Sequence, residues 1–280
     1  MNVQDVVANL KSLPPAPRVM PLLLRALNDV NSSREDIVEL LQLDAGLVAK
    51  ILSVSNSALY GGKGDITDID EAMARLGYRE IYRIVTNIYA KAFVGRGMLS
   101  YQIDSSDRWF NSVATGIVME MLTRRLNVGD PATTYTVGLL HDIGKSVIDE
   151  VYETRYHEVF SIIEKDGMTL QQAECRLFGF DHAQIGAALM QNWNFPDDIV
   201  EPIAFQFEPL KARTQLKVAA MLHLSRWICA SIGGAPGTAA WAFEINAAVL
   251  EMLGCRESII PELLIESKEA LMRKEELLKL

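Results

Sequence analysis

A histidine and an aspartate stand side by side in the apolar stretch GLLHDIGK, residues 138–145. A neutral imidazole and a carboxylate, here His141 and Asp142, are good ligands for a divalent metal such as iron, manganese or zinc. Lys145 follows three residues after Asp142 and is a candidate for holding an anion or a phosphate. A hydrolytic site also needs further nitrogen or oxygen ligands and an open position for water. The pair is therefore at most half of a metal site.

Each of these side chains also has a structural interpretation. His141 and Asp142 can form a buried polar pair that hydrogen-bonds internally, with Arg226 as its ion partner. Lys145 can be a solvated lysine that interacts with the C-terminal end of a helix dipole. His182, in the stretch FDHAQIG, is either a further metal ligand or an ordinary histidine at a helix N-terminus. The residues alone leave these alternatives open.

The elements that position these residues are expected to be helices. Apolar residues recur three and four positions apart, and no convincing alternating strand pattern appears. In the first half of the chain the shared faces are formed by Ile37, Leu40 and Leu41 and by Leu47, Ile51 and Val54. Ser33 and Asp44 are placed to cap the two helices, and Gly77 to end a later one. Residues 132–151, which contain the HD pair, form one of the further helical segments, and the fold class is all-α.

Composition limits what the chain can do. Its 280 residues suffice for one large domain or two modest ones, and 49% hydrophobic and 22% charged residues are typical of a folded soluble protein. A net charge of −9 disfavours non-specific binding to nucleic acids. Cys175, Cys229 and Cys255 lie far apart, so they predict neither a zinc motif nor a disulfide framework. We see no signal peptide and no apolar stretch long enough for a bilayer, so a cytoplasmic location is expected.

Five stretches together resemble the HDOD domain (HD-related output domain), a bacterial branch of the HD superfamily of metal-dependent phosphohydrolases. They are LPPAPRVMPLLLRALND, LLQLDAGLVAKILSVSNSALYG, IDEAMARLGYREIYRIV, GLLHDIGK and DHAQIGAALMQNWNFPDDIVEPIAFQFEP, within roughly residues 10–232. The most specific feature is DAGLVAKILSVSNS upstream of HD-x-G-K. The resemblance implies a multi-helical HD-domain-like bundle with an N-terminal helical lobe over residues 1–97, an HD-like helical core over 98–232 and a C-terminal helical extension over 233–280.

The same resemblance implies that the metal site is degenerate. Catalytic members of the superfamily hold metal with an upstream histidine, the HD pair and a downstream aspartate, and branches with more metals add further histidines. His141 and Asp142 match the HD pair, and His182 matches one of the added histidines. The other ligand positions hold Asn111, Gln206, Phe207 and Arg226. An arginine there brings a fixed positive charge and no acceptor.

Two geometric expectations follow from this alignment. Asn111 should lie near His141 and Asp142, in the place of the missing histidine. The guanidinium of Arg226 should point toward Asp142 and replace the positive charge of a metal.

These observations predict a bacterial signal-transduction or regulatory module that is non-catalytic and needs no cofactor. The alternative is a phosphohydrolase that uses Fe, Mn, Zn or Mg and acts on a nucleotide or another phosphoester. A third possibility is a pocket that binds a nucleotide second messenger without cleaving it, with Lys145 on the phosphate. The expected partners are other signalling proteins and a nucleotide or small phosphorylated ligand, with neither nucleic acid nor membrane.

Overall fold

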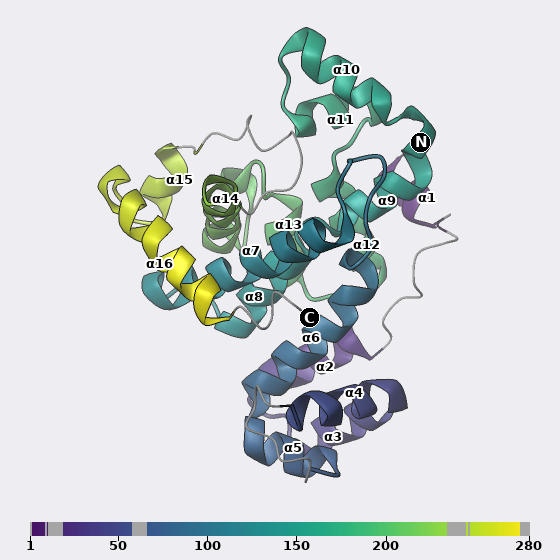
Figure 1. The fold of residues 1–280 in the computed structure, drawn as a ribbon, viewed down its shortest axis with the longest axis vertical. Coiled ribbons are helices and arrows are strands. Elements are labelled where there is room, and N and C mark those ends of the chain that lie inside the picture. Colours follow the sequence, from purple (N-terminus) through teal and green to yellow (C-terminus); the bar gives the residue numbers. More distant parts are fainter. Residues whose placement is uncertain are drawn as a thin grey trace. The chain divides into compact units, whose positions relative to one another are not determined.

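The computed structural model describes residues 2–8, 10, 19–57, 66–233, 245 and 247–274 of the chain (Figure 1). Within these ranges the regular secondary structure is helical, and strand-like pairing is limited to an isolated bridge between Met98 and Ile103. The all-α prediction is confirmed. None of the described helices is both long enough and apolar enough to cross a membrane.

The chain divides into two compact units, Pro15–Ala92 and a larger one that consists of Met1–Pro14 and Phe93–Leu280. The smaller unit contains α2 (Met20–Asn28), α3 (Arg34–Gln42), α4 (Ala45–Ser55), α5 (Ile69–Leu76) and most of α6 (Tyr78–Val94). The helices of the larger unit are α1 (Val3–Ala8), α7 (Ser105–Leu126), α8 (Pro131–Leu140), α9 (Ile143–Tyr152), α10 (His157–Asp166), α11 (Leu170–Phe178), α12 (His182–Asn192), α13 (Asp197–Ala204), α14 (Leu216–Ser231), α15 (Ala247–Met252) and α16 (Ile260–Arg273). The HD pair belongs to the larger unit.

Capping residues set where the helices of the smaller unit begin and end. The Ser33 hydroxyl accepts a hydrogen bond from the Asp36 amide at 3.1 Å, and the Asp36 carboxylate accepts one from the Ser33 amide at 2.8 Å. Asp44 begins α4 by accepting a hydrogen bond from the Leu47 amide at 3.0 Å. Gly77 ends α5 with φ at 78°, a conformation that a residue with a side chain rarely adopts. The three predicted caps, Ser33, Asp44 and Gly77, are confirmed.

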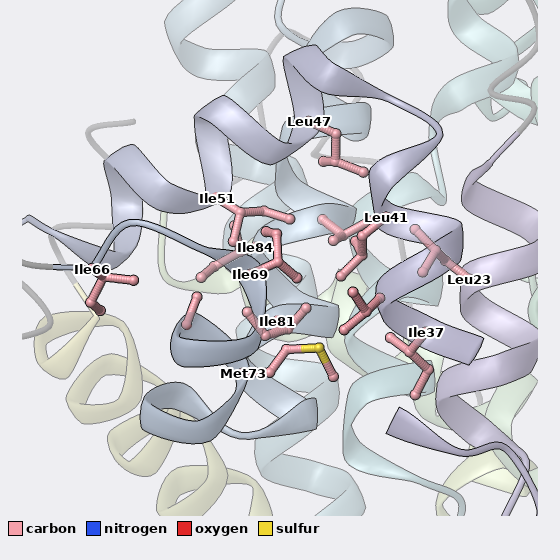
Figure 2. Packing of buried hydrophobic residues seen from close by; sticks show 13 residues of the cluster. Leu23, Ile37, Leu41, Leu47, Ile51, Ile66, Ile69, Met73, Ile81 and Ile84 are labelled. Atoms are coloured by element: carbon pink, nitrogen blue, oxygen red, sulfur yellow. The ribbon is translucent and has the colours of Figure 1, made fainter. Parts of the chain in front are cut away.

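The helices of the smaller unit enclose an aliphatic core (Figure 2). Its buried members are Leu23, Ile37, Val38, Leu41, Leu47, Ile51, Ile66, Ile69, Ala72, Met73, Ile81, Ile84 and Val85. Leu40 and Val54 are partly buried against them, so both apolar faces predicted from the sequence point inward. Full burial of one such aliphatic side chain contributes roughly 1.5–3 kcal/mol, which is why these short helices are stable together.

In the larger unit α7 is the central helix, and it packs against α8, α14 and α16. Most of its residues between Arg108 and Thr123 are buried, as expected for a helix surrounded by others. A second group forms around α12, which packs against α9, α13 and α1. The candidate site residues lie in α7, α9, α12 and α14, at the junction of α8 and α9, and directly after α13.

A carboxylate on α13 fixes the start of α14. Glu201 accepts backbone hydrogen bonds from Arg213 at 2.6 Å and from Gln215 at 2.9 Å, and it also binds the backbone and the hydroxyl of Thr214. These bonds satisfy the amides of the three residues directly before α14, the last of which, Gln215, is its N-cap. The carboxylate therefore sets the position of α14, the helix that carries Arg226.

Candidate functional site

The HD pair lies at a break between two helices. His141 directly follows α8, and Asp142 directly precedes α9 with φ −102° and ψ 15°. The segment predicted as helical over residues 132–151 is therefore two helices. The apolar pattern of the sequence does not reveal the break, because Leu140 before the pair and Ile143 after it are both buried.

Glycines on both sides of the pair bring other helices to it at backbone distance. A Cβ on Gly138 would lie 2.7 Å from the Cα of Gly116 in α7. A Cβ on Gly144 would lie 1.9 Å from the carbonyl oxygen of His182 and 2.6 Å from the nitrogen of Gly186, both in α12. These crossings exist only because the glycines have no side chain. The second crossing places His182 beside the HD pair.

Asp142 is the centre of a buried ionic cluster. The Lys145 ammonium donates a hydrogen bond to Oδ2 of Asp142 at 2.5 Å. The other carboxylate oxygen, Oδ1, lies 3.4 Å from Nε2 of His141 and 3.5 Å from Nε2 of His182. Burial alone would raise the pKa of Asp142, but the neighbouring His141 and Lys145 hold it well below its ordinary value. Asp142 is therefore ionised at neutral pH.

Both histidines are oriented by acceptors at Nδ1. Nδ1 of His141 lies 2.7 Å from the carbonyl oxygen of Gly138, and Nδ1 of His182 lies 2.6 Å from Oε2 of Glu174. Because these partners only accept, each Nδ1 carries the proton, and both Nε2 atoms face Asp142. Burial lowers the pKa of His141. Burial would also lower the pKa of His182, but the Glu174 and Asp142 carboxylates raise it above its ordinary value.

Glu174 of α11 is the second buried carboxylate of the cluster. Its Oε1 accepts hydrogen bonds from the hydroxyls of Tyr101 at 2.8 Å and Tyr156 at 3.0 Å. Its Oε2 also accepts one from the backbone amide of His182 at 2.9 Å. Burial alone would raise the pKa of Glu174, but His182 and these hydrogen bonds lower it. Lys145 Nζ lies 5.6 Å from the centroid of the Tyr101 ring, so the aromatic residues contact both ends of the cluster.

Three of the positions where catalytic relatives carry ligands lie close to this cluster. Gln206 Nε2 donates a hydrogen bond to the carbonyl oxygen of His141 at 2.9 Å. The Phe207 ring meets the His182 ring edge-on, with centroids 5.1 Å apart, and the Arg226 guanidinium lies 4.5 Å from the Phe207 centroid. Burial lowers the pKa of Arg226, and the charge of Asp142 opposes that shift. These side chains support the cluster by packing and hydrogen bonding.

The remaining expectations of the alignment concern Asn111 and the direct pair between Arg226 and Asp142. Asn111 is buried in α7. The ion partner that the structure places on Asp142 is Lys145, at 2.5 Å. The closeness of Asn111 to the HD pair and a direct contact between Arg226 and Asp142 stay predictions.

As arranged, the cluster does not fit a metal ion. In the part of the chain that the structure describes, no group of three or more His, Cys, Asp or Glu side chains is arranged to hold one. Asp142 is paired with the Lys145 ammonium, and Phe207 and Arg226 supply no acceptor. A divalent ion would lie next to that ammonium, and repulsion between cations is strong in a buried site. The negative charges of Asp142 and Glu174 are matched by groups of the protein itself.

Several residues of the cluster were not predicted from the sequence, chiefly Glu174, Tyr101 and Tyr156. Glu174 carried the clearest signal, because it lies four residues after Leu170 on the apolar side of α11, next to buried Ala173. A glutamate on such a face is seldom fully buried without a partner. The partner, His182, is eight residues away and becomes a neighbour only through the turn between α11 and α12.

The cluster predicts a specific dependence of stability on pH. Glu174 and Asp142 both have pKa values lowered by folding, so the unfolded chain takes up protons first, around the ordinary values of 4.5 and 3.8. The two carboxylates stabilise the folded chain at pH values above these ordinary pKa values. This stabilisation is lost as the pH falls from them toward the lower pKa values of the folded state. Glu174→Gln should therefore reduce the slope of unfolding free energy against pH between about pH 5 and about pH 3. Urea unfolding at each pH measures this slope. Glu164→Gln, at an exposed position of α10, is the control, and equal slopes in the two variants would contradict the prediction.

Comparisons with known proteins agree with the helical fold and the HD motif. A model of the HDOD domain family matches residues 13–209. A Treponema pallidum protein of uncharacterised function is 28% identical over 204 residues, which cover 72% of this chain and 39% of the relative, so the chain spans about two fifths of that protein. A solved structure of a proposed phosphohydrolase from Shewanella amazonensis is 28% identical with a TM-score of 0.70, covering 99% of this chain and 97% of the other.

A structure with lower identity shows the fold alone. It is a proposed signal transduction protein from Marinobacter aquaeolei, 23% identical with a TM-score of 0.74, and the match covers 100% of this chain and 62% of that one. The family match extends over more than half of the chain and includes the HD pair, His182 and Gln206. This chain belongs to the HDOD domain family.

Proposed function

We propose that this chain is a regulatory module of bacterial signal transduction that acts through other signalling proteins and does not hydrolyse phosphoesters. The observation that carries the proposal is the buried pair between Lys145 and Asp142, 2.5 Å apart. A metal-dependent hydrolase needs that carboxylate as a metal ligand and an open position for water. In this chain the Lys145 ammonium pairs with the Asp142 carboxylate instead.

The surroundings of the pair support the same proposal. Gln206 uses its side-chain amide to hold the backbone of His141, and Phe207 packs against His182. Neither residue supplies the imidazole that a relative with several metals would use there. Lys145, the candidate for holding a phosphate, already binds Asp142, so a nucleotide or small phosphorylated ligand would have to be held by other groups.

A phosphohydrolase remains the second candidate, and one observation favours it. Both histidines present Nε2 to Asp142 while an acceptor holds Nδ1, which is the orientation that metal-binding histidines adopt. The relative from Shewanella amazonensis, a proposed phosphohydrolase, matches almost the whole chain. In this alternative a divalent metal would be held by His141, Asp142 and His182.

Elemental analysis followed by hydrolysis assays tests the proposal. The full chain is purified without chelator, its Fe, Mn, Zn and Mg contents are measured, and hydrolysis of bis-p-nitrophenyl phosphate and of cyclic nucleotides is followed with each metal added. We expect substoichiometric metal and a rate equal to that of Asp142→Asn. Stoichiometric metal together with hydrolysis that Asp142→Asn abolishes would overturn the proposal in favour of the phosphohydrolase. The same nucleotides, tested for a shift of the melting midpoint, check for a bound ligand.

We also propose that the chain works in the cytoplasm. Cys175, Cys229 and Cys255 are all free thiols, the state that a reducing compartment maintains. Cell fractionation tests the location, and recovery of the protein with the membrane or outside the cell would contradict it.

A further inference from the structure

Helix α6 passes from the smaller unit into the larger one. Its side chains Ile81, Ile84 and Val85 are buried in the aliphatic core of the smaller unit. The last two residues of the helix belong to the larger unit, which resumes at Phe93. We call residues 93–103, which end with the bridged turn before α7, the connector. A change at the connector therefore acts on the end of a helix that forms part of the core of the other unit.

Side chains of α7 and α9 hold the first half of the connector. The buried guanidinium of Arg108 donates one hydrogen bond to the carbonyl oxygen of Arg96 at 3.0 Å and another to the hydroxyl of Ser146. That hydroxyl donates to the carbonyl oxygen of Phe93 at 3.3 Å. The Phe93 ring also packs against Trp193, with centroids 4.7 Å apart. Because the last carbonyl groups of a helix have no partner within it, these bonds fix the end of α6.

Two carboxylates hold the second half of the connector. Asp149 of α9 accepts a hydrogen bond from the Ser100 amide at 2.9 Å. Glu174 of α11 accepts one from the Tyr101 hydroxyl at 2.8 Å, and the Tyr101 ring centroid lies 5.6 Å from Nζ of Lys145. Tyr101 is buried, and a hydrogen bond is stronger where water is excluded. The turn is therefore attached to the buried ionic cluster through Tyr101.

The groups that hold the connector belong to the cluster around Asp142 or lie next to it. Ser146 directly follows Lys145 in α9, and Glu174 is the second buried carboxylate of the cluster. Burial lowers the pKa of Arg108 to about 10, and the charge of Asp142 is the largest of the effects that oppose this shift. Arg108 is therefore charged at neutral pH, and its guanidinium is attracted by the carboxylate of the HD pair.

We propose that the connector couples the buried cluster to the smaller unit. A ligand or partner that draws Tyr101 or Ser146 out of its hydrogen bond releases the end of α6, and local opening of this helix then becomes more frequent. Such coupling is reciprocal, so a partner protein that binds the smaller unit and displaces α6 changes the cluster by the same free energy. This coupling rests on the proposed function, since a regulatory module needs a route by which one part of the chain changes another.

Hydrogen–deuterium exchange of the full chain, measured by mass spectrometry, tests the coupling. Tyr101→Phe removes the bond to Glu174 and Ser146→Ala removes the bond to Phe93, so the connector is released at two separate points. Tyr156→Phe is the matched control, because it removes the other hydroxyl bond to the same oxygen of Glu174, at 3.0 Å, from a residue outside the connector. Helix α16 of the larger unit is the reference for global stability.

In Tyr101→Phe and in Ser146→Ala the amides of α6 should exchange about 2- to 10-fold faster than in the wild type, the change expected for the loss of one hydrogen bond. The increase should extend into residues 78–92, within the smaller unit, and should exceed any change in α16. In Tyr156→Phe the exchange of α6 should equal that of the wild type.

Three results would overturn the coupling. The first is exchange of residues 78–92 that stays at the wild-type rate in both connector variants. The second is an equal increase in α16, which would report a loss of global stability, and the third is the same effect on α6 in Tyr156→Phe. Each of them leaves the proposed function standing if the wild type is metal-free and inactive. Stoichiometric metal and hydrolysis in the wild type would instead contradict the proposed function, whatever the exchange of α6 shows.

Discussion

Replacing Gly144 by alanine is expected to lower the free energy of unfolding by about 3 kcal/mol or more, the upper range for overpacking a protein interior. The added Cβ would lie 1.9 Å from the carbonyl oxygen of His182 and 2.6 Å from the nitrogen of Gly186. Both are backbone atoms, so no side-chain rotation relieves the overlap. Helices α9 and α12 have to separate, and the separation also pulls Asp142 away from His182.

Urea unfolding of the full chain, followed by far-ultraviolet circular dichroism, measures this loss. Gly46→Ala is the matched control, because its Cβ would meet only the carboxylate of Asp44 at 3.3 Å and the site is the first turn of α4. We expect the control to change stability by less than about 1 kcal/mol, since alanine also favours the helix. A loss of similar size in both variants would contradict the close crossing of α9 and α12.

Much of the helical framework could be predicted because its signals are local. The cap at Ser33, the cap at Asp44 and the glycine end at Gly77 depend only on residues within one helical turn. The apolar helix faces depend only on the spacing of apolar residues three and four positions apart, as in Ile37 and Leu41 and in Leu47 and Ile51. All of these features are found in the structure.

The composition of the site could not be predicted in the same way, because its contacts join residues that are distant in the chain. Tyr101 and Glu174 meet through a hydrogen bond of 2.8 Å although they are 73 positions apart. Gly144 and Gly186 reveal their role only once α9 and α12 cross, since a glycine inside a helix has no sequence signal of its own. Residue-by-residue comparison with relatives pointed to Gln206 and Phe207, but it did not indicate that Gln206 holds the backbone of His141.

The position of Lys145 illustrates the same limit. The sequence leaves Lys145 either on a phosphate or in solvent, and the predicted pairing of Arg226 with Asp142 stays a prediction. The structure places Lys145 on Asp142 because the two residues are one helical turn apart at the start of α9. This local pairing was visible in the spacing DIGK, but the spacing does not tell whether the lysine turns inward.

Glu174→Ala is expected to lower the free energy of unfolding by about 3–5 kcal/mol, the range for removing one partner of a buried ion pair. The carboxylate is fully buried and accepts four hydrogen bonds, from two tyrosine hydroxyls and from the backbone and side chain of His182. Without it Nδ1 of His182 and both hydroxyls lose their acceptor in the interior. Glu158→Ala is the control, because the ion pair of Glu158 with Arg155 at 2.9 Å is on the surface and should contribute little.

A double-mutant cycle with His182→Ala separates the ion pair from the loss of packing. Each single variant strands a buried group, the carboxylate in one case and the imidazole N–H in the other, whereas the double variant strands neither. The double variant should therefore be more stable than the sum of the single effects predicts, by about 1–3 kcal/mol. Urea unfolding near neutral pH gives all four free energies. Additive effects would mean that Glu174 and His182 contribute independently, and the cluster around Asp142 would then be a set of separate hydrogen bonds.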